Sequence, residues 1–177
     1  MPGSLNDAGL FLVTTLFDLY LFVLCGRLLL AWVRADYFNP VTRFVIKLTD
    51  PVITRLRRIL PNRRNLETST LVFILFLEIT KLLLISMLFD STPSVAALLF
   101  LTLATTLKLI LSTFFYAILF HAILSWIQPG YSPVSQILSQ LSSPILRPLQ
   151  RAIPPVAGFD LTPLFALIIL QFAMILL

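Results

Sequence analysis

Five ionisable residues interrupt the long apolar stretches of this sequence and are the first candidates for chemistry: Asp18, Arg27, Glu78, Lys81 and Lys108. One charge at the centre of a bilayer costs about 2.5–3.5 kcal/mol, so such residues mark ion pathways, proton relays or internal ion pairs. Glu78 and Lys81 are three residues apart, which puts both on one face of a helix and predicts an ion pair. Lys108 lies near the outer end of its predicted span, 108–127, from which a long side chain can reach the membrane interface.

The sequence has one histidine, His121, and one cysteine, Cys25. A single histidine cannot form the ligand cluster of a zinc site or hold a haem from both sides. A single cysteine cannot form an internal disulfide or a redox pair, and the sequence has no glycine-rich phosphate loop. We therefore expect packing and hydrogen-bonding roles for these two side chains, and no catalytic residue, cofactor or metal site.

Composition places these residues in a membrane. The chain is 58% hydrophobic and 12% charged, whereas soluble domains are about half apolar and a quarter charged. The apolar residues form runs of about twenty, which match the ~30 Å hydrocarbon thickness of a bilayer. The sequence therefore predicts an all-α membrane protein, and the scarcity of glycine and of alternating segments argues against a transmembrane barrel.

Four transmembrane helices are predicted, over about 9–33, 71–89, 108–127 and 161–177. The apolar stretch 95–127 would measure about 50 Å as one helix, which is more than a bilayer requires. It contains no Gly, Pro, Asn or Asp that would form a turn. We therefore expect residues 90–107 to form a connecting helix that either lies at the interface or extends the third span with tilt.

The basic residues predict the orientation of these spans. Ten of the thirteen lysines and arginines lie in two loops, eight between residues 34 and 70 and two after residue 127. The positive-inside rule places both loops in the cytoplasm. With four spans, both termini then lie on the opposite side.

The sequence also contains an internal repeat. Segment 27–32 resembles segment 121–126, and segment 40–61 aligns with 133–154 with seven of 22 positions identical. We therefore predict two copies, 1–89 and 108–177, each made of a span, an amphipathic loop and a second span. Because each copy holds an even number of spans, both insert in the same orientation, related by a pseudo-two-fold axis along the membrane normal.

The amphipathic loops cover residues 39–61 and 132–154. In each loop, capping residues precede prolines, a pattern typical of helix starts: Asn39-Pro40, Asp50-Pro51, Ser132-Pro133 and Ser143-Pro144. The pattern predicts a kinked helical segment in each loop, two short amphipathic helices joined at a proline, lying in the cytoplasmic headgroup layer. We expect its basic residues to bind anionic lipid and not nucleic acid: Arg43, Lys47, Arg55, Arg57, Arg58, Arg63, Arg64, Arg147 and Arg151.

Depth arithmetic predicts one polar pair between the two spans of each copy. Arg27 lies about six residues from the loop end of its span and Glu78 about seven, which makes them level at 1.5 Å per residue. The same count pairs His121 with Gln171 in the second copy. In the alternative arrangement, Glu78 pairs with Lys81 alone and Arg27 extends to the headgroups.

A further set of residues recurs at matching places in the two copies: Trp32, Asn39, Pro40, Pro51 and Pro61 in the first, and Trp126, Pro133, Pro144, Pro154, Asp160 and Pro163 in the second. Together they resemble the motifs of the YggT family of small bacterial integral membrane proteins. In the first copy, Thr70 stands where that family usually has proline. The resemblance implies structural roles for these residues, a multi-pass protein of the bacterial inner membrane with periplasmic termini, and no enzymatic activity.

The resemblance also implies a role in membrane organisation or assembly, because relatives are linked to osmotic or envelope stress, to cell division and to cytochrome complex assembly. Two functions stay open. The first is a scaffold whose paired loops bind anionic lipid and other membrane, division or assembly proteins. The second is a small ion channel or transporter that uses the intramembrane charges; four short spans would then require a homo-oligomer. We favour the scaffold.

Overall fold

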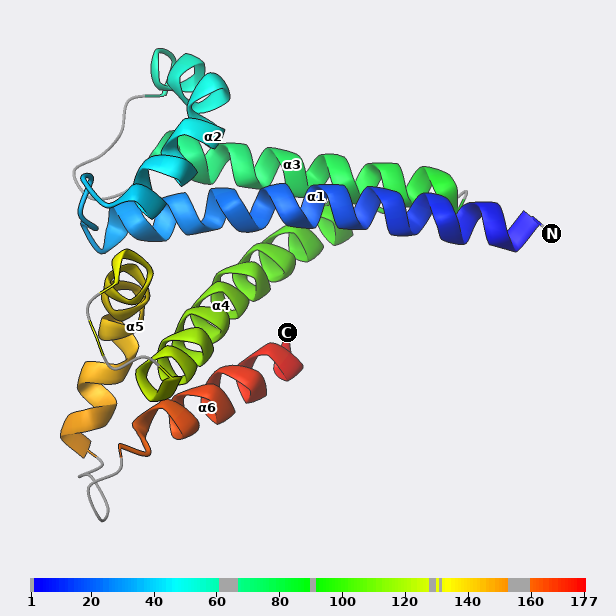
Figure 1. The fold of residues 1–177 in the computed structure, drawn as a ribbon. Coiled ribbons are helices and arrows are strands. Elements are labelled where there is room, and N and C mark those ends of the chain that lie inside the picture. The colour runs from blue at the N-terminus through cyan, green and yellow to red at the C-terminus, as the bar shows by residue number, and fades with distance from the viewer. Residues whose placement is uncertain (1, 61–66, 90–91, 128–129, 131, 153–159) are drawn as a thin grey trace.

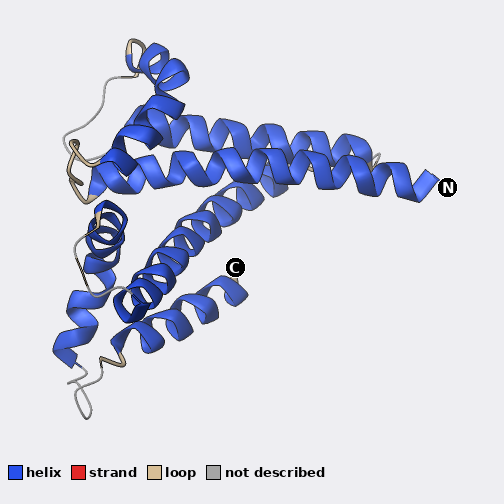
Figure 2. Ribbon diagram, viewed as in Figure 1, coloured by secondary structure: helices blue, strands red, loops and turns tan. Residues whose placement is uncertain are grey.

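The computed structural model describes every residue of the chain except 1, 61–66, 90–91, 128–129, 131 and 153–159. Within the described residues the chain forms helices and turns. In chain order the helices are α1 (Pro2–Trp32), α2 (Pro40–Arg57), α3 (Thr68–Leu88), α4 (Val95–Ile127), α5 (Pro133–Ala152) and α6 (Thr162–Leu176). Figure 2 shows this all-helical composition.

Three of these helices, α1, α3 and α4, are long and apolar enough to cross a membrane. Helix α6 is also apolar, but its 15 residues measure only about 22 Å at 1.5 Å per residue. The structure thus confirms an all-helical chain with membrane-type helices. The fourth span, at α6, stays a prediction.

Helix α4 runs without a break through 33 residues. The expected connecting helix and the expected third span are therefore one continuous helix, which begins at Val95. Figure 1 shows that α4 crosses α1 and α3 at an angle instead of running parallel to them. Such a tilt shortens the distance that a long helix spans across a bilayer. Which part of α4 lies in the membrane stays a prediction.

The six helices form two groups with the same order of elements. Helices α1, α2 and α3 contact one another, and so do α4, α5 and α6; contacts of α4 with α1 and α3, and of α5 with α1 and α2, join the groups. In Figure 1, α2 and α5 lie at the same end of the molecule, where α1 and α4 finish. This placement agrees with two copies that point the same way.

In each loop the helix is continuous, so no separate helix begins at Pro51 or Pro144, and the kink expected at these prolines stays a prediction. Pro51 lies inside α2, and Pro144 and Pro148 lie inside α5. A proline inside a helix removes one backbone hydrogen bond and clashes with the carbonyl four residues earlier, which bends a helix that continues through it. Asp50, which would have capped a new helix at Pro51, instead accepts a hydrogen bond from Arg27.

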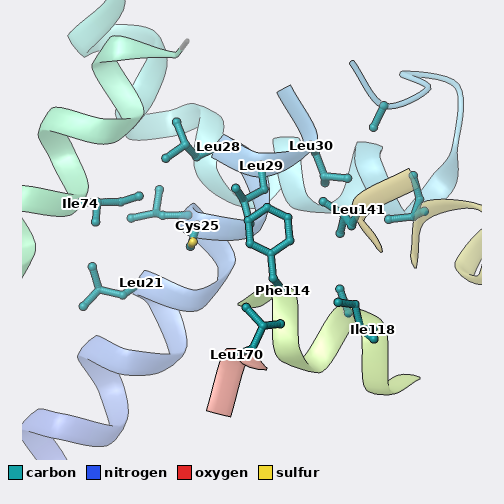
Figure 3. Packing of buried hydrophobic residues seen from close by; sticks show 14 of the residues in the cluster. Leu21, Cys25, Leu28, Leu29, Leu30, Ile74, Phe114, Ile118, Leu141 and Leu170 are labelled. Carbon is teal, nitrogen blue, oxygen red and sulfur yellow. The ribbon is translucent and has the colours of Figure 1, made fainter. Parts of the chain in front are cut away.

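The core lies where the two groups meet. Figure 3 shows Leu21, Cys25, Ile74, Phe114 and Leu170 directed toward one another from four different helices. Cys25 is fully buried, and its Sγ lies 3.9 Å from the carbonyl oxygen of Leu109, in line with the packing role expected for it. Many large apolar side chains of α1, α3, α4 and α6 are exposed, as lipid contact requires.

Candidate functional site

Arg27 organises the corner where α1, α2 and α3 meet. It lies near the end of α1 and is only 4% exposed. Its Nη1 donates to Asp50 Oδ1 at 2.8 Å and to Thr49 Oγ1 at 2.7 Å, and its Nε donates to Glu67 Oε2 at 2.8 Å. One guanidinium thus satisfies groups from α2 and from the residue preceding α3, which fixes the three elements relative to one another.

Glu67 supplies the buried negative charge that pairs with Arg27 where these three helices meet. Its Oε2 also accepts a hydrogen bond from Thr70, and its Oε1 forms an ion pair with Arg57. Burial alone would raise the pKa of Glu67, but the hydrogen bonds from Arg27 and Thr70 and the charges of the two arginines hold it below its usual value. The carboxylate also lies at the N-terminus of α3, where the helix dipole favours a negative charge.

The predicted pair between Arg27 and Glu78 is wrong, because Arg27 bonds to Glu67 and Asp50. The reason lies in the helix ends. Arg27 is five residues from the end of α1, whereas Glu78 is ten residues from the start of α3. At 1.5 Å per residue the two positions differ in depth by about 7.5 Å.

Glu78 instead belongs to a second group of charges, in the middle of the apolar helices. Lys81 Nζ lies 2.8 Å from Glu78 Oε2 and 2.8 Å from Asp18 Oδ1. The expected pair of Glu78 with Lys81 is thus present, and Asp18 joins it from α1. We call Asp18, Glu78 and Lys81 the intramembrane triad. It ties α1 to α3 at a depth where unpaired charges would be costly.

The intramembrane triad borders a cavity of about 680 Å³ between α1, α3, α4 and α6. Lys108, Tyr116 and Gln171 also line it. Gln171 therefore faces this cavity and not His121, whose buried Nδ1 has no hydrogen-bond partner among the described residues. The predicted pair of His121 with Gln171 is wrong, since α4 crosses the other helices at an angle (Figure 1) and residue counts along its axis overstate depth.

The second copy keeps part of the corner that Arg27 organises in the first. Gln150 Nε2 donates to Asp160 Oδ2 at 2.9 Å, at positions 93 residues after Arg57 and Glu67. Asp160 Oδ1 accepts from the backbone N–H of Thr162. Hydrogen bonding with Thr162, first through its side chain and then through its backbone, lowers the pKa of Asp160, and the hydrogen bond from Gln150 adds to the effect.

Basic side chains are exposed along α2, and two more are exposed near the end of α5. A shallow groove of about 590 Å³ on α2 is lined by Arg43, Lys47, Arg55 and Arg58, and Arg43 also stacks over the ring of Phe38 at 5.9 Å. The members of the predicted basic surface that the structure exposes are Arg43, Lys47, Arg55, Arg57, Arg58, Arg147 and Arg151. Arg63 and Arg64 lie outside the described residues.

Asn39 joins the starts of α2 and α5. Its Oδ1 accepts from the N–H of Val41, which confirms the predicted helix cap. Its Nδ2 donates to Pro133 O at 2.8 Å and to Gln136 Oε1 at 3.1 Å. At the start of α5, Ser132 and Ser135 cap each other reciprocally. We call the contacts of Asn39 with α5 the α2–α5 clasp.

The other motif residues have local roles. Pro40, Pro133 and Pro163 lie in the first turns of α2, α5 and α6, where proline is favoured. Trp32 packs edge to face against Phe114 at 6.3 Å. Pro61, Pro154 and the side chain of Trp126 lie outside the described residues.

Sequence reasoning missed Asp50 and Glu67 as partners of Arg27, and Asp18 as a partner of Lys81. Counting residues from the helix ends seen in the structure would have predicted the pair of Asp18 with Lys81. Asp18 is 14 residues from the end of α1, and Lys81 is 13 residues from the start of α3, which makes them level to about 1.5 Å. Among the described residues, no group of three or more His, Cys, Asp or Glu side chains is placed to hold a metal ion.

Both copies of the repeat match a known protein family in sequence. The model of the CCB3/YggT family matches residues 7–88 and 100–177. The chain is 41% identical over 166 residues to an uncharacterized protein in the proC 3′ region of Vibrio alginolyticus, covering 92% of this chain and 89% of that protein. It is 32% identical over 160 residues to the uncharacterized protein YggT of Escherichia coli (strain K12), covering 90% of this chain and 84% of YggT.

A third relative is an uncharacterized protein of Haemophilus influenzae, 36% identical over 169 residues that cover 96% of this chain and 90% of the relative. No solved structure matches the chain. The family model covers most of the chain in two segments, each of which contains one group of three helices. The chain is therefore a member of the CCB3/YggT family with two tandem copies of the family unit.

Proposed function

We propose that this chain is a non-enzymatic scaffold of the bacterial inner membrane, in which α2 and α5 lie in the cytoplasmic headgroup layer and bind anionic lipid. The observation that carries the proposal is the α2–α5 clasp. The donors and acceptors of Asn39, Pro133 and Gln136 hold the two amphipathic helices of different repeats side by side. A joined pair of helices provides one extended surface instead of two independent ones.

The exposed side chains of α2 suit a headgroup layer. Thr42, Thr49 and Ile53 face the rest of the protein, whereas Phe44 and Leu48 are exposed next to basic residues. Exposed apolar residues can enter the acyl boundary while the basic residues contact lipid phosphates. Each Lys or Arg near an anionic surface contributes about 1 kcal/mol, so the four basic residues of the α2 groove would contribute about 4 kcal/mol.

The proposal includes the topology. With α6 as a fourth span and both basic helices in the cytoplasm, the N-terminus and Leu177 face the periplasm. Reporter fusions after Leu177 should then report a periplasmic location. We also propose, from the family resemblance, that the scaffold supports osmotic or envelope stress tolerance or division by organising partner membrane proteins. It would do so as a homo-oligomer or in complexes with those partners.

The test measures how deeply α2 lies in bilayers with and without anionic lipid. Spin labels placed singly at positions 44 and 54 of the purified full chain, in vesicles, report accessibility to oxygen and to a polar relaxer. We expect the label at position 44 to lie deeper in anionic than in neutral vesicles. Exchanging Arg43, Lys47, Arg55 and Arg58 for Gln should remove the difference. Arg57 is left unchanged, because it pairs with Glu67.

The matched control exchanges Arg147 and Arg151 on α5 for Gln, which removes basic charge from the same membrane face but not from the α2 groove. It should leave most of the depth difference at position 44. Equal depth in neutral and anionic vesicles would contradict the proposal.

A second candidate function, a small ion channel or transporter, is favoured by one specific observation. The intramembrane triad and Lys108 line a cavity at membrane depth. Ion flux into vesicles that contain only the purified chain, abolished by Lys81→Met but not by the four Gln exchanges on α2, would favour this function over the scaffold.

A further inference from the structure

The cavity bordered by the intramembrane triad lies in the half of the molecule away from α2 and α5. Asp18 is 14 residues before Trp32, the last residue of α1. This places it about 21 Å along the helix from the end where α2 begins, within the ~30 Å of a bilayer core. In Figure 1 this is the region where α6 and the middle of α4 face α1 and α3.

The cavity has a negative and a positive pole. Lys81 is shared by two carboxylates, so the intramembrane triad carries one net negative charge. Glu78 is buried, whereas the side chain of Asp18 is 60% exposed, and only its Oδ1 is used by Lys81. On α4, Lys108 is exposed and has no ion-pair partner among the described residues. A ligand with both signs of charge would satisfy both poles.

The walls of the cavity suit an amphiphile. Phe22, Phe115 and Met174 supply apolar surface beside the charged groups. The hydroxyl of Ser112 donates to the carbonyl of Leu109, so its oxygen remains free to accept a hydrogen bond from a ligand. Charges at this depth draw headgroups and water into the bilayer. A soluble zwitterion would need the two poles but would gain little from the apolar walls.

We propose that this cavity binds the headgroup of a phospholipid that carries a primary ammonium group, as in phosphatidylethanolamine. The phosphodiester lies at Lys108, and the ammonium donates hydrogen bonds to Asp18 and to the oxygen of Ser112. The glycerol and the first acyl carbons pack on Phe22, Phe115 and Met174. A trimethylammonium headgroup has no N–H to donate to Asp18, and a glycerol headgroup has no cation. The site is separate from the anionic-lipid surface of α2.

The test is a native mass spectrometry titration of the purified full chain in detergent with four ligands. These are phosphatidylethanolamine, phosphatidylcholine, phosphatidylglycerol and the water-soluble glycerophosphoethanolamine. We expect the first to bind tightest. Lys108→Gln and Asp18→Asn should each weaken its binding about tenfold or more, the size of a lost charge-assisted hydrogen bond. Asp18→Asn leaves the pair of Lys81 with Glu78 in place, so this variant keeps its internal ion pair.

Arg34→Gln is the matched control, because it removes one exposed positive charge that lines neither the cavity nor the α2 groove. It should leave the preference for phosphatidylethanolamine unchanged. Equal affinity for the ethanolamine and choline lipids, a preference for phosphatidylglycerol, or unchanged binding in both cavity variants would overturn the proposal. Binding of glycerophosphoethanolamine as tight as that of the lipid would overturn the assignment to a lipid.

Discussion

In the first repeat, the corner where α1, α2 and α3 meet holds four charged side chains, whereas the equivalent corner of the second repeat holds one. The charged residues of the first are Arg27, Asp50, Arg57 and Glu67. The residues 93 or 94 positions later are His121, Ser143, Gln150 and Asp160. Both repeats nonetheless pack three helices in the same order. The ion network is therefore not required to build the unit, in line with the small net contribution of buried ion pairs relative to neutral replacements.

The same contrast holds at membrane depth. The positions of Asp18, Glu78 and Lys81 correspond to Ser112, Gln171 and Met174 in the second repeat. At these three positions the first repeat supplies charges and the second supplies neutral residues, and the second repeat contributes Lys108 to the same cavity from another position. The duplication separates two properties: the helical unit, which both repeats share, and the group of three mutually paired charges, which the first repeat has and the second replaces with neutral residues.

The largest expected effect comes from breaking the intramembrane triad at its centre. Lys81→Met, the residue of the second repeat, leaves Glu78 buried without its partner. We expect a loss of about 3–5 kcal/mol in the free energy of unfolding, as for other buried pairs that lose one member. Unfolding in mixed detergent micelles, followed by circular dichroism, measures it.

The matched variant converts the whole triad to the residues of the second repeat, with Asp18→Ser, Glu78→Gln and Lys81→Met together. It should be much less destabilised than Lys81→Met alone, since no buried charge remains uncompensated. A triple variant as unstable as the single one would show that the charges of the first repeat are essential to its fold, and the comparison of the two repeats would fail.

A smaller effect is expected at the corner near α2. Arg27→Ala removes a partner from both Glu67 and Asp50, but Glu67 keeps Arg57. We therefore expect a loss of about 3 kcal/mol, at the low end for a broken buried pair. The equivalent change, His121→Ala, removes a side chain whose buried Nδ1 has no partner among the described residues and should cost about 1 kcal/mol or less. Equal losses in the same unfolding measurement would contradict this asymmetry.

The features that could be predicted from sequence are those set by local signals. The membrane class, the two copies and the helix starts at Pro40 and Pro133 follow from local signals: apolar length, repeated spacing and a cap before proline. These signals act over a few residues, so neither the tilt of α4 nor the choice among distant partners can be read from them.

The partners of the buried charges depended on the helix ends. Helix α3 begins at Thr68, three residues before the predicted start at Leu71, which moves every depth along it by about 4.5 Å. That error made Glu78 level with Arg27 and hid the match between Asp18 and Lys81. The continuation of α2 through Pro51 was also missed for lack of tertiary information. The carboxylate of Asp50 accepts a hydrogen bond from the distant Arg27 and does not cap a new helix, and no local pattern indicates this contact.

The smallest expected effect is a difference between the repeats in acid. Interactions in the folded protein lower the pKa of Glu67, which is buried, and of Asp160, which is exposed. A carboxylate with a lowered folded-state pKa contributes stability that is complete above its unfolded-state pKa and is lost as the pH falls through the folded-state value. The melting temperature should therefore decrease once the pH falls below the usual pKa range of carboxylates. Glu67→Gln should flatten that fall more than Asp160→Asn, because solvent screens the contacts of the exposed residue. Thermal scans of the two variants and the parent chain from neutral pH to about pH 3 would reveal this order, and a larger flattening in Asp160→Asn would place the acid-sensitive contact in the second repeat.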